Sequence, residues 1–282
     1  MKITAIIQAR STSSRLPNKV LLPLPFNGQT TVLEQVVRRA RCSKRLDEVL
    51  IATTINASDD AIVELCEQKG IPYFRGSEEN VLERYYLAAK SIGTDYVVRI
   101  TSDCPCMDAE VIDRVIDNHF ETKADFTSNA TERTFPYGID LSIFSFKMLE
   151  EAYQNAQHRY EKEHVTTYFY KTRPDKFRLN VVKATKDTYA PDIRVTLDTQ
   201  EDYTLLCIVY DYLYSNNPFF DIHDILGLFE EKPWLKGVNN KVHQKLAHKN
   251  LESELEEVKV YCKQQDLEKA LHFITMNSAN DE

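Results

Sequence analysis

Residues 3–19 read ITAIIQARSTSSRLPNK, an apolar and β-branched run that changes after Gln8 into cations and hydroxyl groups. The apolar run predicts a buried strand over Ile3–Ala9. Downstream, Thr31–Cys42 places apolar residues on one helical face, and Val49–Thr54 again has the composition of a strand. Strands that alternate with helices in this way predict an α/β protein with a mainly parallel sheet, covered by helices on both faces.

Further elements continue this alternation as far as Phe120. The predicted strands are 72–74 and 95–101, and the predicted helices are 58–69, 80–91 and 108–120. Rossmann-like sheets of this kind bind their ligands at the carboxyl ends of the strands. We therefore expect the functional site at three loops, which are Arg10–Lys19, Thr53–Asp59 and Thr101–Asp108.

From Asp125 onwards the pattern indicates a mixed-sheet lobe for a second substrate. The predicted strands are Phe126–Ser128, Ile139–Phe144, Phe177–Val182 and Ile193–Thr196, and the predicted helices are Lys147–Ala156, Glu163–Thr172 and Thr199–Tyr214. Beyond Ser215 the chain is helical and polar, with an amphipathic stripe over Lys249–Phe273. We expect a catalytic domain over residues 1–214 and a helical C-terminal extension over residues 215–282, which packs on this domain or on a second subunit.

The charge of the chain restricts its partners. Lys and Arg total 35 against 43 Asp and Glu, and the net charge of −8 argues against a general nucleic-acid binder or a membrane-surface protein. A local basic cluster can still bind a small anion. We find no run of 18 apolar residues and no signal peptide, and the six cysteines are scattered, so we expect a protein of the reducing cytoplasm.

The loop after the first strand has the composition of a polyphosphate site. Arg10, Arg15 and Lys19 alternate with hydroxyl-bearing residues, among them Ser13 and Ser14. Arginine gives bidentate contacts to phosphate, lysine gives a point charge, and backbone N–H groups complete such a site. The glycine patterns of Walker A and dinucleotide-binding loops are absent from the sequence. The alternative interpretation is a solvated basic loop.

Two aspartates are candidate ligands of a divalent metal. Asp103 follows the predicted strand 95–101 and Asp198 follows the predicted strand 193–196, so both lie at strand ends although 95 residues separate them. Proteins bind Mg²⁺ through one or two carboxylates together with phosphate oxygens and water. On physical grounds alone an equally good alternative is an Asx turn at Asp103 and a neighbour of the helix N-cap at Asp198.

With these loops in view, the sequence resembles the nucleotide-sugar cytidylyltransferases, the family of the acylneuraminate and 3-deoxy-manno-octulosonate (KDO) enzymes. Within this family it is most similar to the spore coat polysaccharide biosynthesis branch. The matching blocks are Ala9-Arg10, Ser13 or Ser14, Arg15-Leu16-Pro17-Asn18-Lys19, Ile51–Thr54, Phe74–Ser77, Val81–Arg84, Arg99–Pro105, Glu163–Thr166 and Leu197–Asp202. The likeness extends from Ile3 to about Leu213 and, more weakly, to about Lys245.

The resemblance implies a fold of the nucleotide-diphosphosugar transferase type and the transfer of CMP from CTP to a hydroxyl of an acidic sugar, with release of pyrophosphate. It implies that Arg10, Arg15 and Lys19 hold the β and γ phosphates and that Asp103 and Asp198 bind the catalytic magnesium. Arg15, Lys19 and Asp103 are therefore the predicted catalytic residues. A homodimer is the usual arrangement of related enzymes.

The helix after Asp198 departs from the family at one position. The chain has Gln200 where the family often has proline, which removes a rigid first turn but no ligand. Asp202 fits the capping of this helix better than metal binding, so it ranks second as a metal ligand.

Further binding residues are predicted at two places. For the nucleotide we expect Thr53, Thr54, Asn56, Arg75 and Ser77. For the acceptor we expect Arg133, Tyr137, Asp140, His164 and Arg194. Each group has an alternative: a simple turn for the first three nucleotide residues, a structural role for His164, and an ion pair with Asp192 for Arg194.

Two other functions fit parts of this pattern. A glycosyltransferase with a nucleotide-sugar donor has the same type of sheet, but the D-x-D motif typical of those enzymes is absent at Ser102–Pro105. A non-catalytic nucleotide-binding protein is the second alternative, and the intact cationic loop and both aspartates argue against it. The identity of the acceptor does not follow from the sequence, and the preference for CTP rests on the resemblance.

Overall fold

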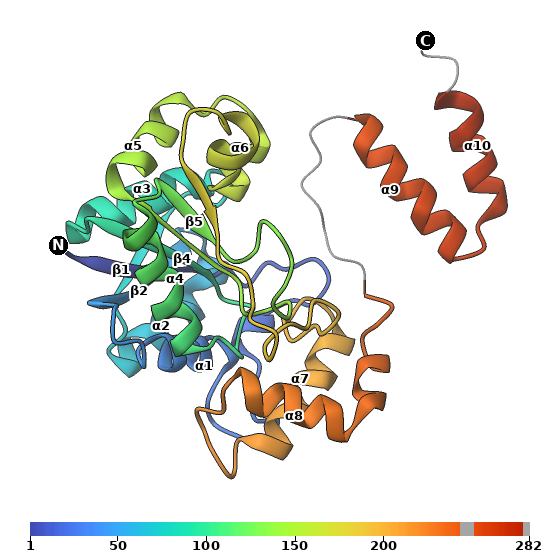
Figure 1. The fold of residues 1–282 in the computed structure, drawn as a ribbon, viewed down its shortest axis with the longest axis horizontal. Coiled ribbons are helices and arrows are strands. Elements are labelled where there is room, and N and C mark those ends of the chain that lie inside the picture. Colours follow the sequence, from blue (N-terminus) through green and yellow to red (C-terminus); the bar gives the residue numbers. More distant parts are fainter. Residues whose placement is uncertain (243–250, 279–282) are drawn as a thin grey trace. The chain divides into compact units, whose positions relative to one another are not determined.

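The computed structural model describes residues 1–242 and 251–278, and the chain divides into two compact units, Met1–Val242 and His243–Glu282. Seven strands of the first unit form one sheet in the order β3-β2-β1-β4-β6-β5-β7. Strands β1, β2, β4 and β5 of this sheet are labelled in Figure 1. Their bounds are β1 Ile3–Gln8, β2 Glu48–Thr54, β3 Tyr73–Gly76, β4 Tyr96–Thr101, β5 Phe126–Ser128, β6 Leu141–Ser145 and β7 Leu179–Val181. Strands β1 to β4 pair in parallel, whereas β6 runs antiparallel to its neighbours β4 and β5. The predicted mainly parallel α/β sheet is thereby confirmed.

Helices α1 to α4 begin and end where nearby groups satisfy the free backbone groups of their terminal turns. Their bounds are α1 Val32–Ala40, α2 Asp60–Lys69, α3 Val81–Ile92 and α4 Ala109–Thr122. Thr31 and Glu34 form a capping box at α1, and the side chains of Asn80 and Asp108 accept N-terminal N–H groups of α3 and α4. Gly70 ends α2 with φ 59°, a left-handed conformation that costs glycine nothing.

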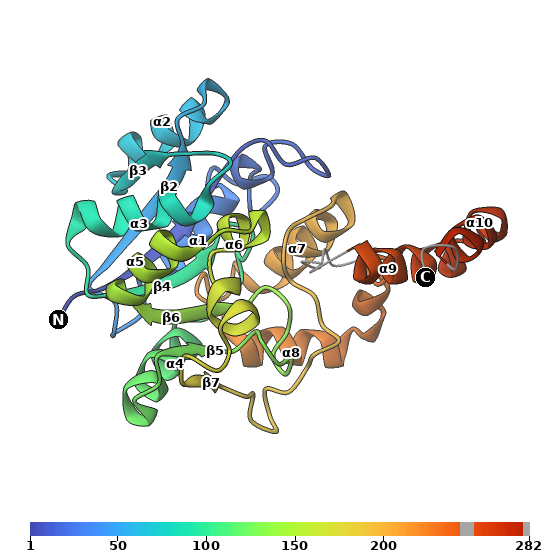
Figure 2. The same ribbon diagram turned by 90° about the horizontal axis from the view of Figure 1, so that it is seen from above.

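Apolar side chains pack against both faces of the sheet and give the first unit two core layers. One layer contains Leu33 of α1 and Ile112 of α4. The other contains Tyr85 of α3 and Leu149 of α5 (Phe146–Asn155), and α3 and α5 lie side by side (Figure 2). Successive residues of a strand point to opposite faces, so a continuously apolar strand contributes to both layers. The predicted helical covering of both faces is confirmed.

The segment after α5 differs from the prediction. Instead of one helix over Glu163–Thr172, α6 spans Arg159–His164 and a π-helix, η3, spans Tyr168–Thr172. Between them Val165 has φ 57° and ψ −62°, which interrupts the helix. Val165 and Phe169 both enter the core, so the apolar periodicity continues across the break and could not reveal it.

The predicted strand Ile193–Thr196 is wrong. Arg194 forms an isolated parallel bridge with Tyr137, in which Tyr137 N–H donates to the Ile193 carbonyl at 2.9 Å and Val195 N–H to the Tyr137 carbonyl at 2.8 Å. The two segments approach so closely that a Cβ on Gly138, which has φ 102°, would lie 2.6 Å from the backbone of Val195. Only glycine fits there. The pairing fixes one turn and does not extend into a ladder.

The first unit extends to Val242, beyond the expected boundary at residue 214. Its last elements are α7 Gln200–Leu213, α8 Ile222–Glu231 and a 3-10 turn, η4, Pro233–Gly237. Phe220 is fully buried, and the guanidinium of Arg39 lies 4.4 Å from the centre of its ring. Asp108 accepts the Ile222 N–H at 2.9 Å. Residues 215–242 therefore pack on α1 and on the start of α4 through apolar and polar contacts.

The described part of the second unit consists of α9, Leu251–Gln264, and α10, Glu268–Ser278. The stripe predicted over Lys249–Phe273 is interrupted at Asp266, where φ is 54° and the Leu267 N–H donates to the Cys262 carbonyl at 2.8 Å. Such a left-handed residue is a common end of a helix. Residues 249 and 250 lie outside the described residues, and the expected packing of the extension stays a prediction.

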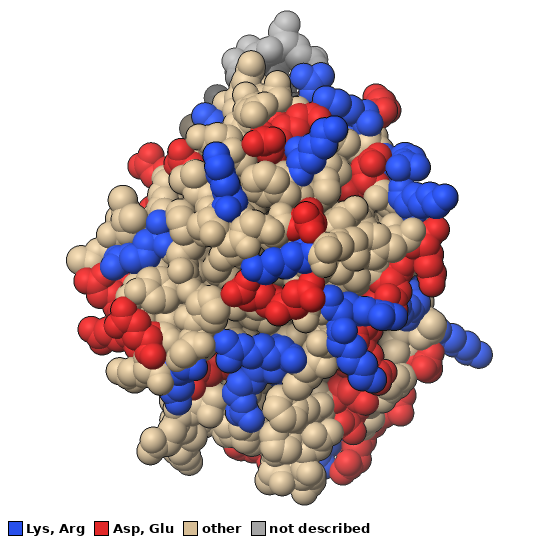
Figure 3. Space-filling view, turned by 90° about the vertical axis from the view of Figure 1, so that its left-hand side faces the viewer, with Lys and Arg blue, Asp and Glu red and all other residues tan. Residues whose placement is uncertain are grey.

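The surface carries both signs of charge. Figure 3 shows lysine and arginine side chains interspersed with acidic side chains across one face of the protein. Among the described residues, no helix is long and apolar enough to span a membrane.

Candidate active site

Asp103 and Asp198 converge on one cation. Lys19 Nζ lies 3.0 Å from Asp103 Oδ2 and 2.9 Å from Asp198 Oδ1. The backbone supports this arrangement, because the N–H of Leu197 donates to the Asp103 carbonyl at 2.8 Å. The loop after β4 and the loop before α7 are thus joined at the carboxyl end of the sheet. The sequence analysis expected this convergence, and the structure has it.

Lys19 is held by three acceptors. Besides the two carboxylates, its ammonium donates to the Leu197 carbonyl at 2.6 Å, and the side chain is largely buried. Burial by itself would lower the pKa of Lys19, but Asp103 and Asp198 outweigh it and raise that pKa above its ordinary value. The ammonium is therefore charged at neutral pH and bridges both aspartates.

Asp198 binds two further cations. Arg15 contacts its Oδ1 at 3.0 Å, and Arg194 contacts its Oδ2 at 2.9 Å. Burial would raise the pKa of Asp198, whereas Lys19, Arg15 and Arg194 lower it below its ordinary value. Asp198 is therefore an anion in contact with three cations, two from the loop after β1 and one from the segment before α7.

Arg194 does not pair with Asp192, which contacts Lys236 instead at 2.7 Å. Its Nε and one terminal nitrogen each bind Asp202 at 2.9 Å, in a bidentate pair. Asp202 is fully buried and also completes the capping box of α7 with Thr199, as predicted. Arg194 thus fixes Asp198 and Asp202 relative to each other.

Asn239 also belongs to this cluster, although it was not among the predicted site residues. Its amide donates to Asp202 Oδ1 at 2.8 Å and to the Arg194 carbonyl at 3.1 Å, and the residue is buried. It lies in the segment assigned to the C-terminal extension, where no motif marks it. A lone asparagine gives no signal before the fold brings it to the site.

The aspartate pair fits a divalent cation. Lys19 Nζ is a stand-in, because a cation at its position meets a hard carboxylate oxygen from each aspartate. In residues 1–242 and 251–278 no group of three or more His, Cys, Asp and Glu side chains forms a closed metal site. A metal held by Asp103 and Asp198 would therefore need ligand oxygens and water, which is the preference of Mg²⁺.

Asp59 anchors the start of the cationic loop through Ser11. It was not among the predicted site residues. Asp59 Oδ1 accepts the Ser11 N–H at 2.7 Å and the Ser11 hydroxyl at 2.6 Å, and Oδ2 accepts the Thr54 hydroxyl. Burial would raise the pKa of Asp59, but the bonds from Ser11 and Thr54 lower it. The start of the loop is thus fixed to the end of β2.

The tip of the loop is more open. Arg10 is exposed and lies 3.7 Å from Glu78 Oε1, its ion-pair partner. The side chains of Ser13 and Ser14 form no hydrogen bond with other residues of the described chain. These groups remain predicted phosphate contacts, together with the partly exposed Arg15.

The predicted nucleotide residues fall into two groups. Thr53 and Thr54 are both fully buried at the end of β2, so their hydroxyls point into the protein and not into a loop facing a ligand. Asn56 is partly exposed and donates to Glu78, which also accepts the Thr12 hydroxyl at 2.9 Å. Glu78 was not predicted, and it connects three of the loops at this edge.

Arg75 and Ser77 support the neighbouring backbone. Arg75 donates to the carbonyls of Thr54 and Asn56 at 2.8 and 2.9 Å and pairs with Asp60 at 2.8 Å. The Ser77 hydroxyl accepts the Asn80 N–H at 3.1 Å, just before α3. Both side chains are engaged in holding the loops that surround the predicted nucleotide site.

The predicted acceptor residues on the loop before β6 pair with one another. Arg133 forms a bidentate ion pair with Asp140, and its guanidinium lies 3.7 Å from the centre of the Tyr137 ring. The guanidinium of Arg194 lies 6.0 Å from the centre of the same ring. The charge of Arg133 is therefore neutralised within the protein.

His164 ends α6 and is partly buried. Burial lowers its pKa, the positive charges of Arg99 and Lys171 lower it further, and Glu163 opposes them. The imidazole forms no hydrogen bond within the described residues. It is therefore neutral at pH 7 and available to a ligand.

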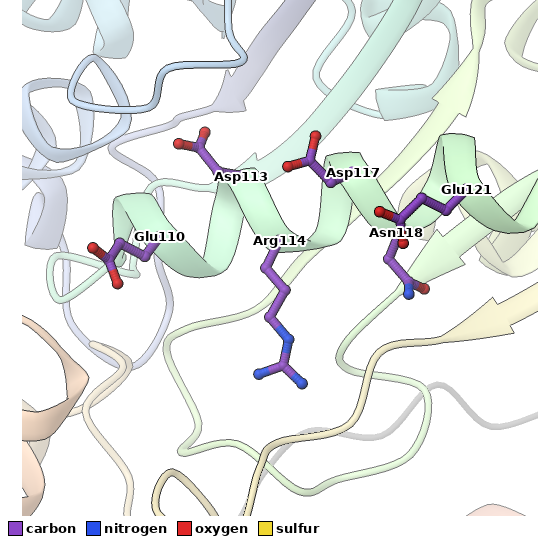
Figure 4. A pocket seen from close by; sticks show the side chains of 6 residues that line it. All are labelled: Glu110, Asp113, Arg114, Asp117, Asn118 and Glu121. Carbon is purple, nitrogen blue, oxygen red and sulfur yellow. The ribbon is translucent and has the colours of Figure 1, made fainter.

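A hollow outside this edge runs along α4 (Figure 4). It is lined by Glu110, Asp113, Arg114, Asp117, Asn118 and Glu121. Asp113 accepts N–H groups of Lys44 and Arg45, and Asp117 pairs with Arg45 at 2.8 Å. These carboxylates stabilise the turn before β2, so the hollow is not the candidate active site.

Comparison with known proteins gives a consistent result. Residues 4–270 match the family model described as "Cytidylyltransferase". The chain is 33% identical over 237 residues to the spore coat polysaccharide biosynthesis protein SpsF of Bacillus subtilis, covering 82% of this chain and 95% of that protein.

Two solved structures extend the comparison. A cytidylyltransferase from Leptospira borgpetersenii has a TM-score of 0.77 and 32% identity, covering 88% of this chain and all of that one. A CMP-KDO synthetase solved with CTP has a TM-score of 0.55 and 14% identity, covering 75% of this chain and 99% of that one, and supports the fold alone.

Proposed function

The chain belongs to the cytidylyltransferase family, and from this premise we propose that it transfers CMP from CTP to a hydroxyl of an acidic sugar or related acceptor. Pyrophosphate is released, and the product serves surface polysaccharide biosynthesis, the process named for the Bacillus relative. The observation that carries this proposal is the convergence of Asp103 and Asp198 on Lys19, with Arg15 beside them. Carboxylates and cations at one sheet edge are what nucleotidyl transfer requires.

The cations of the loop bind the triphosphate. In the ligand-free protein Arg15 and Lys19 are attached to Asp198, and Arg10 is loosely paired with Glu78. Phosphate oxygens offer these three side chains stronger, doubly charged partners. Arg10, Arg15 and Lys19 then hold the β and γ phosphates and stabilise the negative charge that develops on departing pyrophosphate.

Asp103 and Asp198 are the residues that would hold magnesium. When bound, the ion supplies positive charge at the α-phosphate and lowers the pKa of the attacking hydroxyl. Arg194 and Asn239 keep Asp198 and Asp202 in register through the contacts described above. The protein contributes mainly orientation and charge, since no covalent nucleophile is needed for this transfer.

Two further properties accompany the proposal. All six cysteines are free thiols in the structure, which suits the reducing cytoplasm where we place the reaction. We also propose a homodimer, by likeness to related enzymes, and light scattering of the purified chain measures its mass in solution.

The direct test incubates the purified protein with Mg²⁺, each of the four nucleoside triphosphates and a panel of acidic sugars, KDO and N-acetylneuraminate among them. We expect pyrophosphate release with CTP and a CMP-linked product by mass spectrometry. Tight CTP binding without pyrophosphate for any acceptor would favour a non-catalytic nucleotide-binding protein. A parallel incubation supplies nucleotide-sugars in place of the triphosphates, and their consumption without pyrophosphate would favour a glycosyltransferase.

Arg15→Ala tests the phosphate-binding role. This side chain is partly exposed, so its removal leaves the core intact, and we expect turnover to fall by about 100-fold. Circular dichroism checks the fold of the variant. Wild-type turnover in Arg15→Ala would contradict the role of the loop.

A further inference from the structure

Arg99 is a cation without an acidic partner. It lies on β4, opposite Ser142 of β6 and four residues before Asp103. One terminal nitrogen donates to Gln8 Oε1 at 3.2 Å, but Nε is shielded from solvent and has no hydrogen-bond partner in the described chain. Within residues 1–242 and 251–278 it forms no ion pair. A buried donor left unsatisfied is costly, so such a group calls for a ligand.

The cations of this edge that were predicted to bind phosphate at the aspartates or to contact the acceptor have acidic partners in the protein itself. Lys19, Arg15 and Arg194 contact Asp198, and Arg133 contacts Asp140. A chain of net charge −8 has acidic residues in excess, yet none is placed against Arg99. The acceptor residues predicted from the sequence, Arg133 and Arg194, are therefore already neutralised, whereas Arg99 is not.

The end of α6 and η3 pack on the face of the sheet that carries Arg99, because Val97, two residues earlier on β4, shares a core layer with Val165 and Phe169. The positive charge of Arg99 acts on His164, the last residue of α6, and on Tyr170 of η3. Lys171 adds a second positive charge near His164. We call the group formed by Gln8, Arg99, His164 and Tyr170 the Arg99 pocket, in which Arg99 supplies a positive charge and Glu163 acts on His164 with the opposite sign.

The backbone around His164 is strained. Val165 has φ 57° and ψ −62°, and the Thr166 N–H donates to the His164 carbonyl at 2.5 Å, which is a γ-turn of the unfavourable hand. A β-branched residue in this region is a genuine outlier, and such strain is concentrated at functional sites. The following π-helix, Tyr168–Thr172, is likewise a rare form that occurs frequently at functional sites.

We propose that Arg99, assisted by Gln8 and His164, binds the anionic group of the acceptor, a carboxylate or a phosphate, and so selects acidic acceptors. That the anion belongs to the acceptor rests on the proposed function, whereas the binding of an anion at Arg99 does not. Arg99 precedes Asp103 by four residues, a reach of at most about 14 Å in extended chain. One sugar acid can therefore place its charge at Arg99 and a hydroxyl at the aspartates.

The experiment measures anion binding directly, without turnover. Sulfate stands for a phosphate group and acetate for a carboxylate, each titrated into the whole protein with CTP and Mg²⁺ saturating, while NMR follows the His164 ring. We expect anion binding to raise the pKa of His164 in the wild type. Arg99→Gln should weaken the affinity for the preferred anion by about tenfold or more. Arg99→Lys, which keeps the charge but loses the planar fork, should restore part of it.

Arg178→Gln is the matched control, because Arg178 is an exposed arginine that pairs with Asp125. It should leave the titration unchanged. Equal sulfate and acetate affinities in wild type and Arg99→Gln would overturn the proposal. A preference for acetate identifies a carboxylate as the recognised group, and a preference for sulfate identifies a phosphate.

A failure of the proposed function gives a different result. If CTP does not bind, the titration is repeated with the nucleotide-free protein. A loss of anion affinity in Arg15→Ala then locates the anion at the cationic loop, and a loss in Arg99→Gln locates it at the Arg99 pocket. With a working acceptor, Arg99→Gln should raise its KM while KM for CTP stays the same. The wild type should prefer KDO over its uncharged C1 amide, and the variant should lose this preference.

Discussion

Two charged regions at the carboxyl end of the sheet differ in how their charges are paired. In the aspartate cluster, defined as Lys19, Arg15, Arg194, Asp103, Asp198 and Asp202, each cation contacts a carboxylate. In the Arg99 pocket the guanidinium has only Gln8, and its Nε has no partner among the described residues. In the aspartate cluster the charges are already paired, so a ligand must displace existing ion pairs. In the Arg99 pocket an anionic ligand would supply the partner that the guanidinium lacks.

The largest expected effect comes from Asp198, which three cations contact. Asp198→Asn removes the negative charge that positions Lys19, Arg15 and Arg194, and we expect turnover to fall by at least about 100-fold. Pyrophosphate release measures this loss. Asp192→Asn is the matched control, since Asp192 is exposed and contacts Lys236, and it should retain normal turnover. If both variants behave alike, the aspartate cluster is not the catalytic centre.

A second variant removes the cation that Asp103 and Asp198 share in the aspartate cluster. Lys19→Met removes the ammonium that occupies the space between Asp103 and Asp198 while keeping the length of the side chain. We expect the nucleotide-free variant to bind Mn²⁺ about tenfold more tightly than the wild type, although its turnover falls. Electron paramagnetic resonance of free Mn²⁺ measures the affinity. Unchanged or weaker Mn²⁺ binding would show that Lys19 and the metal do not compete.

Asp59 should have a smaller effect, because it acts through Ser11 on the loop and not on the ligand. Asp59→Asn keeps the shape of the side chain but loses one acceptor of the three hydrogen bonds from Ser11 and Thr54. We expect KM for CTP to rise several-fold with little change in kcat. An altered kcat at constant KM would argue for a different role. Thermal unfolding checks that the variant is folded.

The smallest effect concerns pH and affects only the Arg99 pocket. His164 has its pKa lowered by burial, by Arg99 and by Lys171, against the opposing charge of Glu163, so it is neutral at pH 7. A bound anion favours the protonated ring, and affinity for sulfate, which does not titrate here, should therefore rise as the pH falls from neutral towards the lowered pKa of His164. His164→Gln should give a flat profile. A rise that persists in this variant would assign the titration to another group.

Much of the first half followed from local rules. An uninterrupted apolar strand, a cap such as Thr31 and a terminator such as Gly70 act over a few residues, so Ile3–Gln8 and α1 to α4 appear close to their predicted bounds. The break at Val165 did not follow, because a strained φ depends on the surrounding core and leaves the apolar period unchanged.

The site divides in the same way. Asp103, Asp198, Lys19 and Arg15 were found because charged groups at strand ends share one edge of a parallel sheet. Glu78, Asn239 and the role of Asp59 were not found, because each acts through a partner far away in the sequence. Arg133 and Arg194 were assigned to the acceptor, yet the fold supplies both with carboxylates.

The amino-acid sequence alone determined the type of sheet, the cationic loop after its first strand and the two aspartates, since periodicity and charge are local properties. Tertiary structure decided which charges neutralise one another and which do not. Pairing depends on distances of about 3 Å between groups that come from separate loops. Only folding sets those distances, and it leaves Arg99 beside Gln8 and without a carboxylate in the described chain.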